Sequence, residues 1–366
     1  MLYKPDVEEI RPRVEAWWRR ELFDRACIAV RAPNGRQRRE VAAPATARER
    51  QTNAAYLLDT AEAAMEATYY GGEAIPVWTH HLLPDGFSGC LGAPIEFAED
   101  TSWAKPIIED WDRPPTFEID RESWMWRWYM DAYRLAAERA AGRFFVGAPD
   151  CHSGGDCLLA MRGGTRLCVD LYDRPDAIAA AMAKLARTVI DFHEGFWPLI
   201  EASGQRGHTT AWAEILSPGR SNVIQLDLLA LISPRHFAEF FYHELEVQAE
   251  YLDNSIFHLD GPDAIKHLPR LYELMHSSQA TAGGNRSGLV CIQWVYGAGN
   301  GPMTRWIDLL KDMQANGCNL QLSCEPREVE TLMTELSSKG LWLSTWAGSR
   351  EEADDLIRLV ARLTHD

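Results

Sequence analysis

The residues best suited to chemistry lie in the short phrase His258-Leu259-Asp260-Gly261. The phrase ends an apolar run that is typical of a strand, and residues i and i+2 of a strand point to the same side. An imidazole and a carboxylate at this spacing can therefore address one small object, and Gly261 allows the chain to turn sharply behind them. Two kinds of chemistry fit the pair, metal binding and proton transfer.

In the first interpretation, a divalent metal such as zinc binds His258 and Asp260, and Cys324 or Glu214 completes a site of mixed ligands. In the second, the Asp260 carboxylate orients His258 for proton transfer. A structural interpretation also stays open, in which Asp260 caps a helix that begins near Pro262 and His258 is a hydrogen-bonded core histidine.

Two further segments carry acid/base groups. The segment Asp150–Asp156 offers Asp150 and His152 beside two glycines, a composition that fits a ligand loop and an ordinary turn equally. His80 and His81 follow another apolar run, and in an extended chain they point to opposite sides, so at most one of them reaches a site.

Several familiar motifs are missing. The run Gly297–Gly301 lacks the G-x-G-x-x-G spacing of a dinucleotide fingerprint, although it can present backbone N–H groups to a carboxylate or phosphate. The chain has no G-x-S-x-G, Walker A, H-E-x-x-H or kinase signature. The sequence therefore does not predict nucleophilic serine chemistry.

The elements that position these groups follow from the alternation of short apolar runs with longer amphipathic stretches, which is typical of βα units and a parallel sheet. The runs that we predict to be strands are Ala26–Ala32, Ala74–Thr79, Arg143–Ala148, His208–Ile215, Ser255–Asp260, Gly288–Val295, Asn319–Cys324 and Leu341–Trp346. Eight such units predict a (β/α)₈ TIM barrel, in which the active site lies at the carboxyl ends of the strands.

Helix signals lie between the runs. Pro175 suits the first turn of a helix over Pro175–Ile200, and Ser233 suits the N-cap of a helix that continues over His236–Leu252. Ser349, with Glu352 three residues later, predicts the start of the last helix. We expect one domain over residues 1–366, with an N-terminal helical extension and a long insertion after strand 2, at Pro84–Arg121.

Composition and charge exclude other classes. The net charge of −16 makes nucleic acid and anionic lipid unsuitable as general partners. No apolar run approaches the roughly 20 residues that span a bilayer, and the N-terminus lacks a signal-peptide core. The eight cysteines show none of the dense spacing of a disulfide scaffold. We expect a cytoplasmic protein.

Three phrases give the chain a family resemblance: Phe257–Pro262, Ile292–Asn300, and Asp227 through Ser233-Pro234 to Phe240. With them the chain resembles the uroporphyrinogen decarboxylase-like superfamily, which contains uroporphyrinogen decarboxylase and the zinc-dependent methyltransferases that use methylated corrinoid proteins. The resemblance covers most of the chain and is greatest to a poorly characterised branch. The fold that it implies is again a (β/α)₈ barrel.

The catalytic patterns of the superfamily match only in part. The methyltransferases carry a His-x-Cys-Gly zinc motif at the fifth strand end, where this chain has His258 but Asp260 in place of the cysteine. Their later cysteine would fall near Trp346 and is missing. The decarboxylase pattern also lacks its last histidine, and its arginine-rich loop is only faintly echoed around Arg31, so we do not expect porphyrinogen decarboxylation.

The resemblance implies an enzyme that transfers a methyl or other one-carbon group, or removes one. His258, Asp260 and Cys324 would hold the metal, and Glu214, Asp150 or His152 would move the proton. The residues from which we expect substrate contacts are Trp78, His80, Gln293, Trp294 and Asp227. A corrinoid or folate would carry the methyl group, and a small-molecule substrate, a corrinoid protein and a second copy in a homodimer are the expected partners.

Two other functions remain open at this stage. One is a metal-free decarboxylase or lyase that uses His258 and Asp260 as an acid/base pair on a small carboxylate or sugar-like substrate. The other is a non-catalytic barrel that only binds a ligand.

Overall fold

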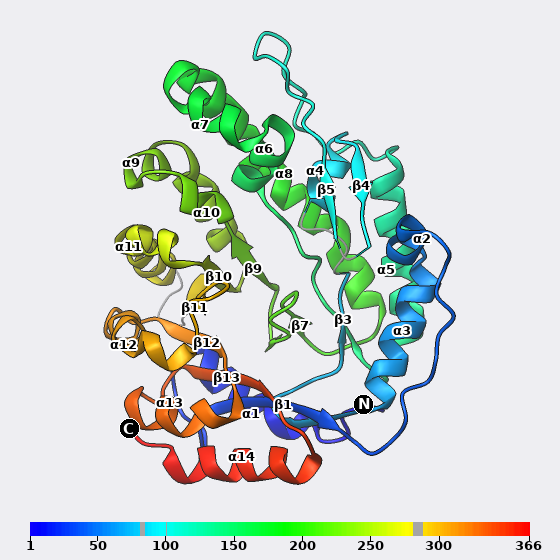
Figure 1. Cartoon of the computed structure of the whole chain (residues 1–366), viewed down its shortest axis with the longest axis vertical. Helices are drawn as coiled ribbons and strands as arrows, with labels where there is room; N and C mark the ends of the chain where they lie inside the picture. Colours follow the sequence, from blue (N-terminus) through cyan, green and yellow to red (C-terminus); the bar gives the residue numbers. More distant parts are fainter. Residues whose placement is uncertain (81–84, 100, 281–287) are drawn as a thin grey trace.

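A seven-stranded sheet organises the chain in the order β2-β1-β13-β12-β11-β10-β9 (Figure 1). The computed structural model describes residues 1–80, 85–99, 101–280 and 288–366. The strands of the sheet are β1 (Cys27–Pro33), β2 (Thr68–Gly72), β9 (Ser221–Gln225), β10 (Asn254–Asp260), β11 (Gly288–Val295), β12 (Asn319–Ser323) and β13 (Leu341–Trp346). Only the edge strand β2 runs antiparallel to its neighbour, so the carboxyl ends of the other strands meet at one edge.

The register of this sheet brings polar side chains to one level. His258 of β10 pairs with Gln225 of β9 and Gln293 of β11, and Gln293 in turn pairs with Gln321 of β12. The strands themselves are almost wholly buried, as parallel strands covered on both faces are. A row of amides inside such a sheet needs hydrogen-bond partners: Gln293 finds them within the row, and Gln225 and Gln321 also donate to neighbouring side chains.

Helices lie outside the arc of strands, with α10 to α14 following one another around it (Figure 1). The helices are α1 (Val7–Trp18), α2 (Ala47–Thr52), α3 (Ala54–Glu66), α4 (Gly86–Cys90), α5 (Trp124–Ala140), α6 (Gly154–Arg162), α7 (Gly164–Asp173), α8 (Pro175–Ala202), α9 (Pro234–His236), α10 (Tyr242–Tyr251), α11 (Leu268–Ala280), α12 (Ile307–Ala315), α13 (Val329–Glu335) and α14 (Arg350–Leu363). Short turns are the 3₁₀ helices η1 (Asp227–Leu231), η3 (Pro262–His267), η4 (Met303–Trp306) and η5 (Pro326–Glu328), and the π-helical η2 (Phe237–Phe241).

The predicted helix starts are confirmed. Pro175 occupies the first turn of α8, and the Ser233 side chain accepts a hydrogen bond from the His236 N–H at the start of α9. The Ser349 side chain caps α14 in the same way. The N-terminal helical extension is α1. Within the described ranges, no helix is long and apolar enough to cross a membrane.

The predicted fourth strand is wrong. Only His208–Thr209 is extended there, as β7, and it pairs antiparallel with β8 (Leu216–Ser217). Between them the chain turns, with Glu214 in the left-handed region at φ 51° and the Ile215 N–H donating to the Thr210 Oγ1. The strand that lies parallel beside β10 is the later β9.

The predicted second and third strands shrink to a parallel pair, β3 (Val77–Trp78) and β6 (Phe145–Val146). The insertion after strand 2 is present between β3 and α5. Its described part contains α4 and the antiparallel pair β4 (Ile95–Phe97) and β5 (Ser102–Ala104). The Asp85 carboxylate accepts a hydrogen bond from the Ala104 N–H and so ties the beginning of the insertion to β5. Pro84, where we expected the insertion to begin, lies outside the described residues, as does His81.

Candidate functional site

Two overlapping groups of ionisable side chains gather at the carboxyl edge of the sheet. Asp227, His258 and Asp260 offer ligand atoms that all lie within 4.8 Å of one another, and so do His152, Asp156 and Asp227. His258 and Asp260 come from the end of β10, while Asp227 begins η1 directly after β9. His152 and Asp156 flank the start of α6. Asp227 belongs to both groups.

The protonation of His258 is fixed by its neighbours. Its Nδ1 lies 2.6 Å from the Gln293 Oε1, and the Trp212 Nε1 donates to the same oxygen at 3.0 Å. An indole N–H only donates, so the Gln293 atom between the two rings must be the carbonyl oxygen. Nδ1 of His258 therefore carries a hydrogen, and in the neutral imidazole Nε2 has the lone pair that a metal would bind, the arrangement that orients a histidine for a metal.

Asp227 and Asp260 complete the first group. The Asp227 Oδ1 is buried and has no hydrogen-bond partner among the described residues. Burial opposes the charge of Asp227, but the hydrogen bond and charge of His152 and the charge of His258 bring its pKa below the ordinary value. Burial raises the pKa of Asp260, against the charge of His258. Within the described chain the Asp260 carboxylate caps no helix, because η3 begins at Pro262 without a side-chain cap.

In the second group the polar atoms of His152 are already engaged in hydrogen bonds. The His152 Nδ1 lies 3.3 Å from Asp85 and its Nε2 lies 3.5 Å from Asp227. Burial alone would lower the pKa of His152, but the hydrogen bonds to Asp227 and Asp85 raise it to about 10. His152 is therefore a cation between two carboxylates, and both of its nitrogens are occupied by hydrogens rather than free to bind a metal.

Asp156 has a supporting role. Its two carboxylate oxygens accept hydrogen bonds of 2.8 Å from the N–H groups of Asp227 and Leu228. Burial raises the pKa of Asp156 to about 6, against the charge of His152. The side chain thus fixes the first residues of η1 and, through them, the position of Asp227.

The first group fits a divalent metal better than the second. It offers the free Nε2 of His258, the unpartnered oxygen of Asp227 and the Asp260 carboxylate at the rim. Imidazole nitrogen and carboxylate oxygen are both ligand types that zinc accepts, and catalytic zinc sites use three protein ligands and leave one position open. The mixed nitrogen and oxygen donors also suit other first-row metals.

The remaining predicted acid/base and metal residues lie near this cluster but outside both groups. Glu214, in its turn, forms an ion pair with Arg31 of β1. Asp150 accepts a hydrogen bond of 3.0 Å from the Gln225 Nε2. Cys324 lines a neighbouring cavity, and burial raises the pKa of its thiol to about 12, which disfavours the thiolate that a metal requires.

Three predicted substrate-binding rings pack in the core. Trp78 is 4% exposed and contacts Tyr133, and His80 is 3% exposed and lies edge-on to Trp128. Trp294 is fully buried and packs on Trp306 of η4. Side chains alternate along a strand, so Gln293 facing the cluster sends Trp294 to the helix side. The placement of these three rings gives no support to substrate contact.

A cavity of about 370 Å³ is lined in part by Gln293, the hydrogen-bond partner of His258. The residues that line it are Arg31, Trp212, Ala213, Gln293, Tyr296, Gln321, Ser323, Cys324, Glu325, Ser344, Thr345 and Trp346. Trp212 and Gln293 belong both to this lining and to the surroundings of His258. Two lining residues were not predicted from the sequence. Trp212 lies in the wrongly predicted strand, and Gln321 could have been indicated by the alternation along β12.

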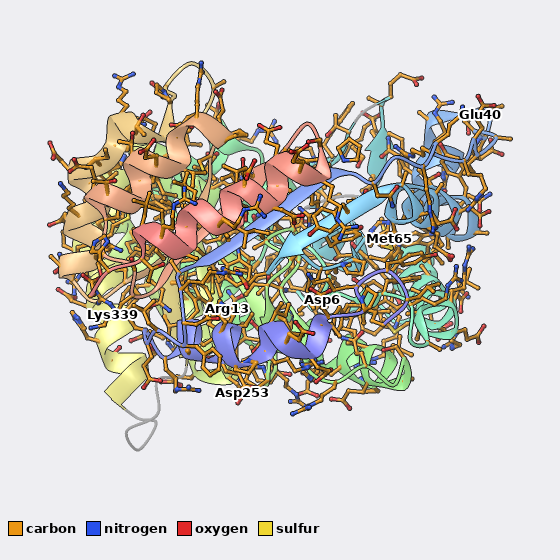
Figure 2. The ribbon with its side chains drawn as sticks, turned by 90° about the horizontal axis from the view of Figure 1, so that it is seen from below. Asp6, Arg13, Glu40, Met65, Asp253 and Lys339 are labelled. Carbon is orange, nitrogen blue, oxygen red and sulfur yellow. The ribbon has the colours of Figure 1, made fainter. Side chains whose placement is uncertain are left out.

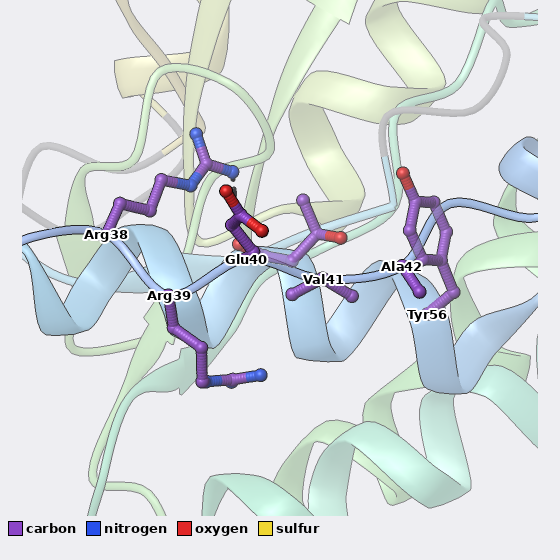
Figure 3. A pocket seen from close by; sticks show the side chains of 7 residues that line it. Arg38, Arg39, Glu40, Val41, Ala42 and Tyr56 are labelled. Atoms are coloured by element: carbon purple, nitrogen blue, oxygen red, sulfur yellow. Dashed lines mark hydrogen bonds between the residues drawn. The ribbon is translucent and has the colours of Figure 1, made fainter.

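A larger hollow of about 660 Å³ lies elsewhere, where the extended segment with Arg38 and Arg39 runs along α3 (Figure 3). Both arginines are exposed and donate to backbone carbonyls of α3, at Thr60 and Asp59. These contacts hold the segment on the helix. Because both arginines face solvent and hold the segment on α3, we do not regard this hollow as the functional site.

Comparison with protein-family models finds no match, and comparison with curated protein sequences finds none either. Among solved structures, a methyltransferase from Methanosarcina mazei is similar, with a TM-score of 0.59 and 13% sequence identity. The similarity covers 96% of this chain and 98% of that chain. The two chains share a fold. At this identity the likeness concerns the fold alone and transfers no residue role.

Proposed function

We propose that the protein is a methyltransferase-like enzyme of one-carbon transfer, including demethylation, with its active site at Asp227, His258 and Asp260. The observation that carries the proposal is the convergence of these ligand atoms within 4.8 Å at the carboxyl edge of the sheet. The shared fold with a methyltransferase along nearly the whole chain supports it. We further propose that β3, β6 and β7 close the sheet into the barrel of the uroporphyrinogen decarboxylase-like superfamily.

Asp227, His258 and Asp260 would hold a divalent metal, for which zinc is our first choice, and the bound metal would polarise the heteroatom that gives or accepts the methyl group. The protein's own contribution is to orient and to protonate. Gln293 holds His258 with its Nε2 toward the site, and Asp156 holds Asp227 through the backbone.

His152 is the group beside the cluster that carries a transferable proton. Loss of a methyl group leaves negative charge on the heteroatom, and a cationic imidazole can neutralise that charge by giving its proton. Asp85 and Asp227 keep His152 protonated until then. Of the three predicted proton carriers His152 is thus favoured, because Glu214 is engaged with Arg31 and Asp150 accepts a hydrogen bond from Gln225. A corrinoid or folate remains the proposed methyl carrier, and a corrinoid-binding protein and a second copy of the chain remain proposed partners.

Metal analysis with matched variants tests the proposal. We expect stoichiometric zinc or another divalent metal in the purified protein, its loss in His258→Ala, and its retention in Cys324→Ser. Methyl transfer from a panel of O-, N- and S-methyl compounds to cob(I)alamin or tetrahydrofolate should depend on that metal. Active protein that contains and needs no divalent metal would rule out the metal site.

A metal-free decarboxylase or lyase is the second candidate. The observation that favours it is the histidine cation between the Asp85 and Asp227 carboxylates, which is an acid/base arrangement that needs no ion. Turnover of a small carboxylate at full rate in the presence of a chelator would select this candidate over the first.

A further inference from the structure

A chain of hydrogen bonds crosses the wall of the cavity beside His258. The Gln293 Nε2 donates to the Gln321 Oε1 at 2.6 Å, and the Gln321 Nε2 donates to the Ser344 Oγ at 3.1 Å. The Trp342 Nε1 donates to the same Ser344 Oγ at 3.2 Å. Together with the hydrogen bond from Trp212 to Gln293, these bonds join side chains of β11, β12 and β13 into one polar wall of the cavity.

The direction of every bond in this wall is determined by chemistry. Trp212 can only donate, so Gln293 presents its oxygen to Trp212 and its NH₂ group to Gln321. Gln321 must then accept through its oxygen and donate through its own NH₂ group to Ser344. The Ser344 oxygen receives two hydrogens, one of them from Trp342, which also can only donate.

The polar wall therefore has more hydrogen-bond donors than acceptors. Among the described residues each amide NH₂ group uses one of its two hydrogens, so Gln293 and Gln321 each keep one free donor, and the Ser344 hydroxyl keeps its own. On the acceptor side, both lone pairs of the Gln293 Oε1 are taken, and only one on Gln321 remains. Since Gln293 and Gln321 are 5% and 2% exposed, bulk water does not satisfy these donors freely.

A cation and three aromatic rings complete the cavity. Arg31 lies over the Trp346 ring, with its Cζ 5.8 Å from the ring centroid, and pairs with Glu214 through one end of its guanidinium group. A guanidinium has five N–H donors, so this pair leaves several for a ligand. Trp212 and Tyr296 supply flat apolar surface. Glu325 at the rim is paired with Arg327 at 2.6 Å, which offsets its negative charge.

We propose that this cavity binds the carboxylate group of a small-molecule substrate through the free donors of Gln321, Ser344 and Arg31, with the reacting end toward His258. A surplus of donors beside a cation suits a carboxylate, which only accepts hydrogen bonds. About 370 Å³ limits the ligand to a small molecule, and the rings favour a flat one. The assignment of the reacting end rests on the function proposed above.

Calorimetric binding of benzoate, with benzamide as the neutral control of equal shape, tests this inference. We expect benzoate to bind at least about tenfold more tightly than benzamide. Gln321→Leu and Arg31→Gln should each weaken benzoate binding by about tenfold, and Ser344→Ala should weaken it less. Arg305→Gln is the matched control, because Arg305 also lies over an indole, that of Trp306, but outside the cavity lining.

The inference would be overturned if benzoate, acetate and succinate all bound no better than their amides. Retained benzoate affinity in folded Gln321→Leu and Arg31→Gln proteins would also overturn it. The measurement is made on metal-loaded and metal-stripped protein. A lack of metal with intact, carboxylate-selective binding would refute the metal site and leave this inference standing.

Discussion

At the scale of single residues, the chemistry of His258 depends on a neighbour that its own strand does not reveal. The i, i+2 spacing indicated correctly that His258 and Asp260 stand together, and the structure adds Asp227 to them. The tautomer of His258, however, follows from Trp212, which lies in a turn between two short strands. A hydrogen bond between segments so far apart in sequence leaves no periodic signal, so the sequence indicated that His258 and Asp260 lie together but could not indicate which nitrogen of His258 carries the hydrogen.

Trp212→Phe should allow His258 to populate both neutral tautomers. Phenylalanine keeps the ring contact but removes the donor that holds the Gln293 oxygen in place, so the amide can turn and the imidazole hydrogen can move to Nε2. We expect ¹⁵N NMR of the metal-free protein to show Nδ1–H alone in the wild type and a mixture in the variant. Trp197→Phe on α8 is the control: it removes the indole donor to the Tyr251 hydroxyl of α10 and should leave His258 unchanged. A single unchanged tautomer in Trp212→Phe would contradict the argument.

At the scale of elements, the short helix η1 is held by a buried carboxylate rather than by its own residues. Asp156 accepts from two successive N–H groups at the start of η1, and a buried donor left without an acceptor costs about 1–3 kcal/mol. We expect Asp156→Asn to lower the free energy of unfolding by about that amount, because the amide turns a donor toward one of the two N–H groups. Urea unfolding measures the loss. Asp191→Asn, on the exposed face of α8, should cost little, and an equally stable Asp156→Asn protein would refute the role of Asp156.

The fourth strand shows why part of the fold could not be predicted. The run from His208 to Ile215 looks like a strand, but Glu214 adopts a left-handed conformation and the chain turns back. The true neighbour of β10 begins with Ser221 and Asn222, whose polarity is typical of a loop. Asn222 is buried because its side chain donates to the Pro149 carbonyl and accepts from the Ala211 N–H. Tertiary hydrogen bonds of this kind override local pattern, whereas β10 to β13, with long apolar runs, were predicted nearly to the residue.

The long helix α8 carries a histidine that should make stability depend on pH. His193 is 2% exposed, stacks on Trp197, and has a pKa lowered by burial to about 4. In the unfolded chain His193 takes up a proton near pH 6.5, and in the folded chain it does so only near pH 4. The contribution of the buried, neutral His193 to the free energy of unfolding is therefore complete above pH 6.5 and is lost as the pH falls toward 4. The loss is on the order of 3 kcal/mol.

Urea unfolding of the wild type and His193→Phe between pH 7.5 and 4 checks this prediction. The difference in unfolding free energy between the two proteins should change in favour of the variant as the pH falls. Phe192→Leu is the control, one residue away and also buried. It should lower the free energy of unfolding by an amount that does not change with pH. A constant difference between wild type and His193→Phe across the range would show that His193 does not titrate as its burial requires.

At the scale of the whole molecule, the two ends of the chain are built into one sheet. β1 lies between β2 and β13, with α1 along one side of β1 and α14 along the other (Figure 2). Arg13 of α1 pairs at 2.6 Å with Glu73, whose buried carboxylate also accepts from the Ile28 N–H of β1. The alternation of elements predicted a parallel sheet, but the antiparallel β2 and these ionic ties depend on contacts that no local pattern contains.

Trp17 should therefore control the stability of the whole chain. Its indole donates to the Gly340 carbonyl at 2.9 Å and its ring packs on Trp342, while its own carbonyl accepts from Asn319 at 2.6 Å. One side chain of the first helix thus supports the beginnings of β12 and β13. Trp17→Ala should cost about 3–5 kcal/mol.

The form of the transition tests whether residues 1–366 fold as one unit. If they do, far-ultraviolet circular dichroism and tryptophan fluorescence should report one coincident unfolding transition in the wild type, and the whole transition should shift to lower denaturant in Trp17→Ala. Trp103→Ala is the control, since this tryptophan is 44% exposed on β5 and should shift the transition little. If the contacts of Trp17 were only local, an early step would separate from an unshifted main transition. A single displaced transition follows only when the first helix and the last strands share one core.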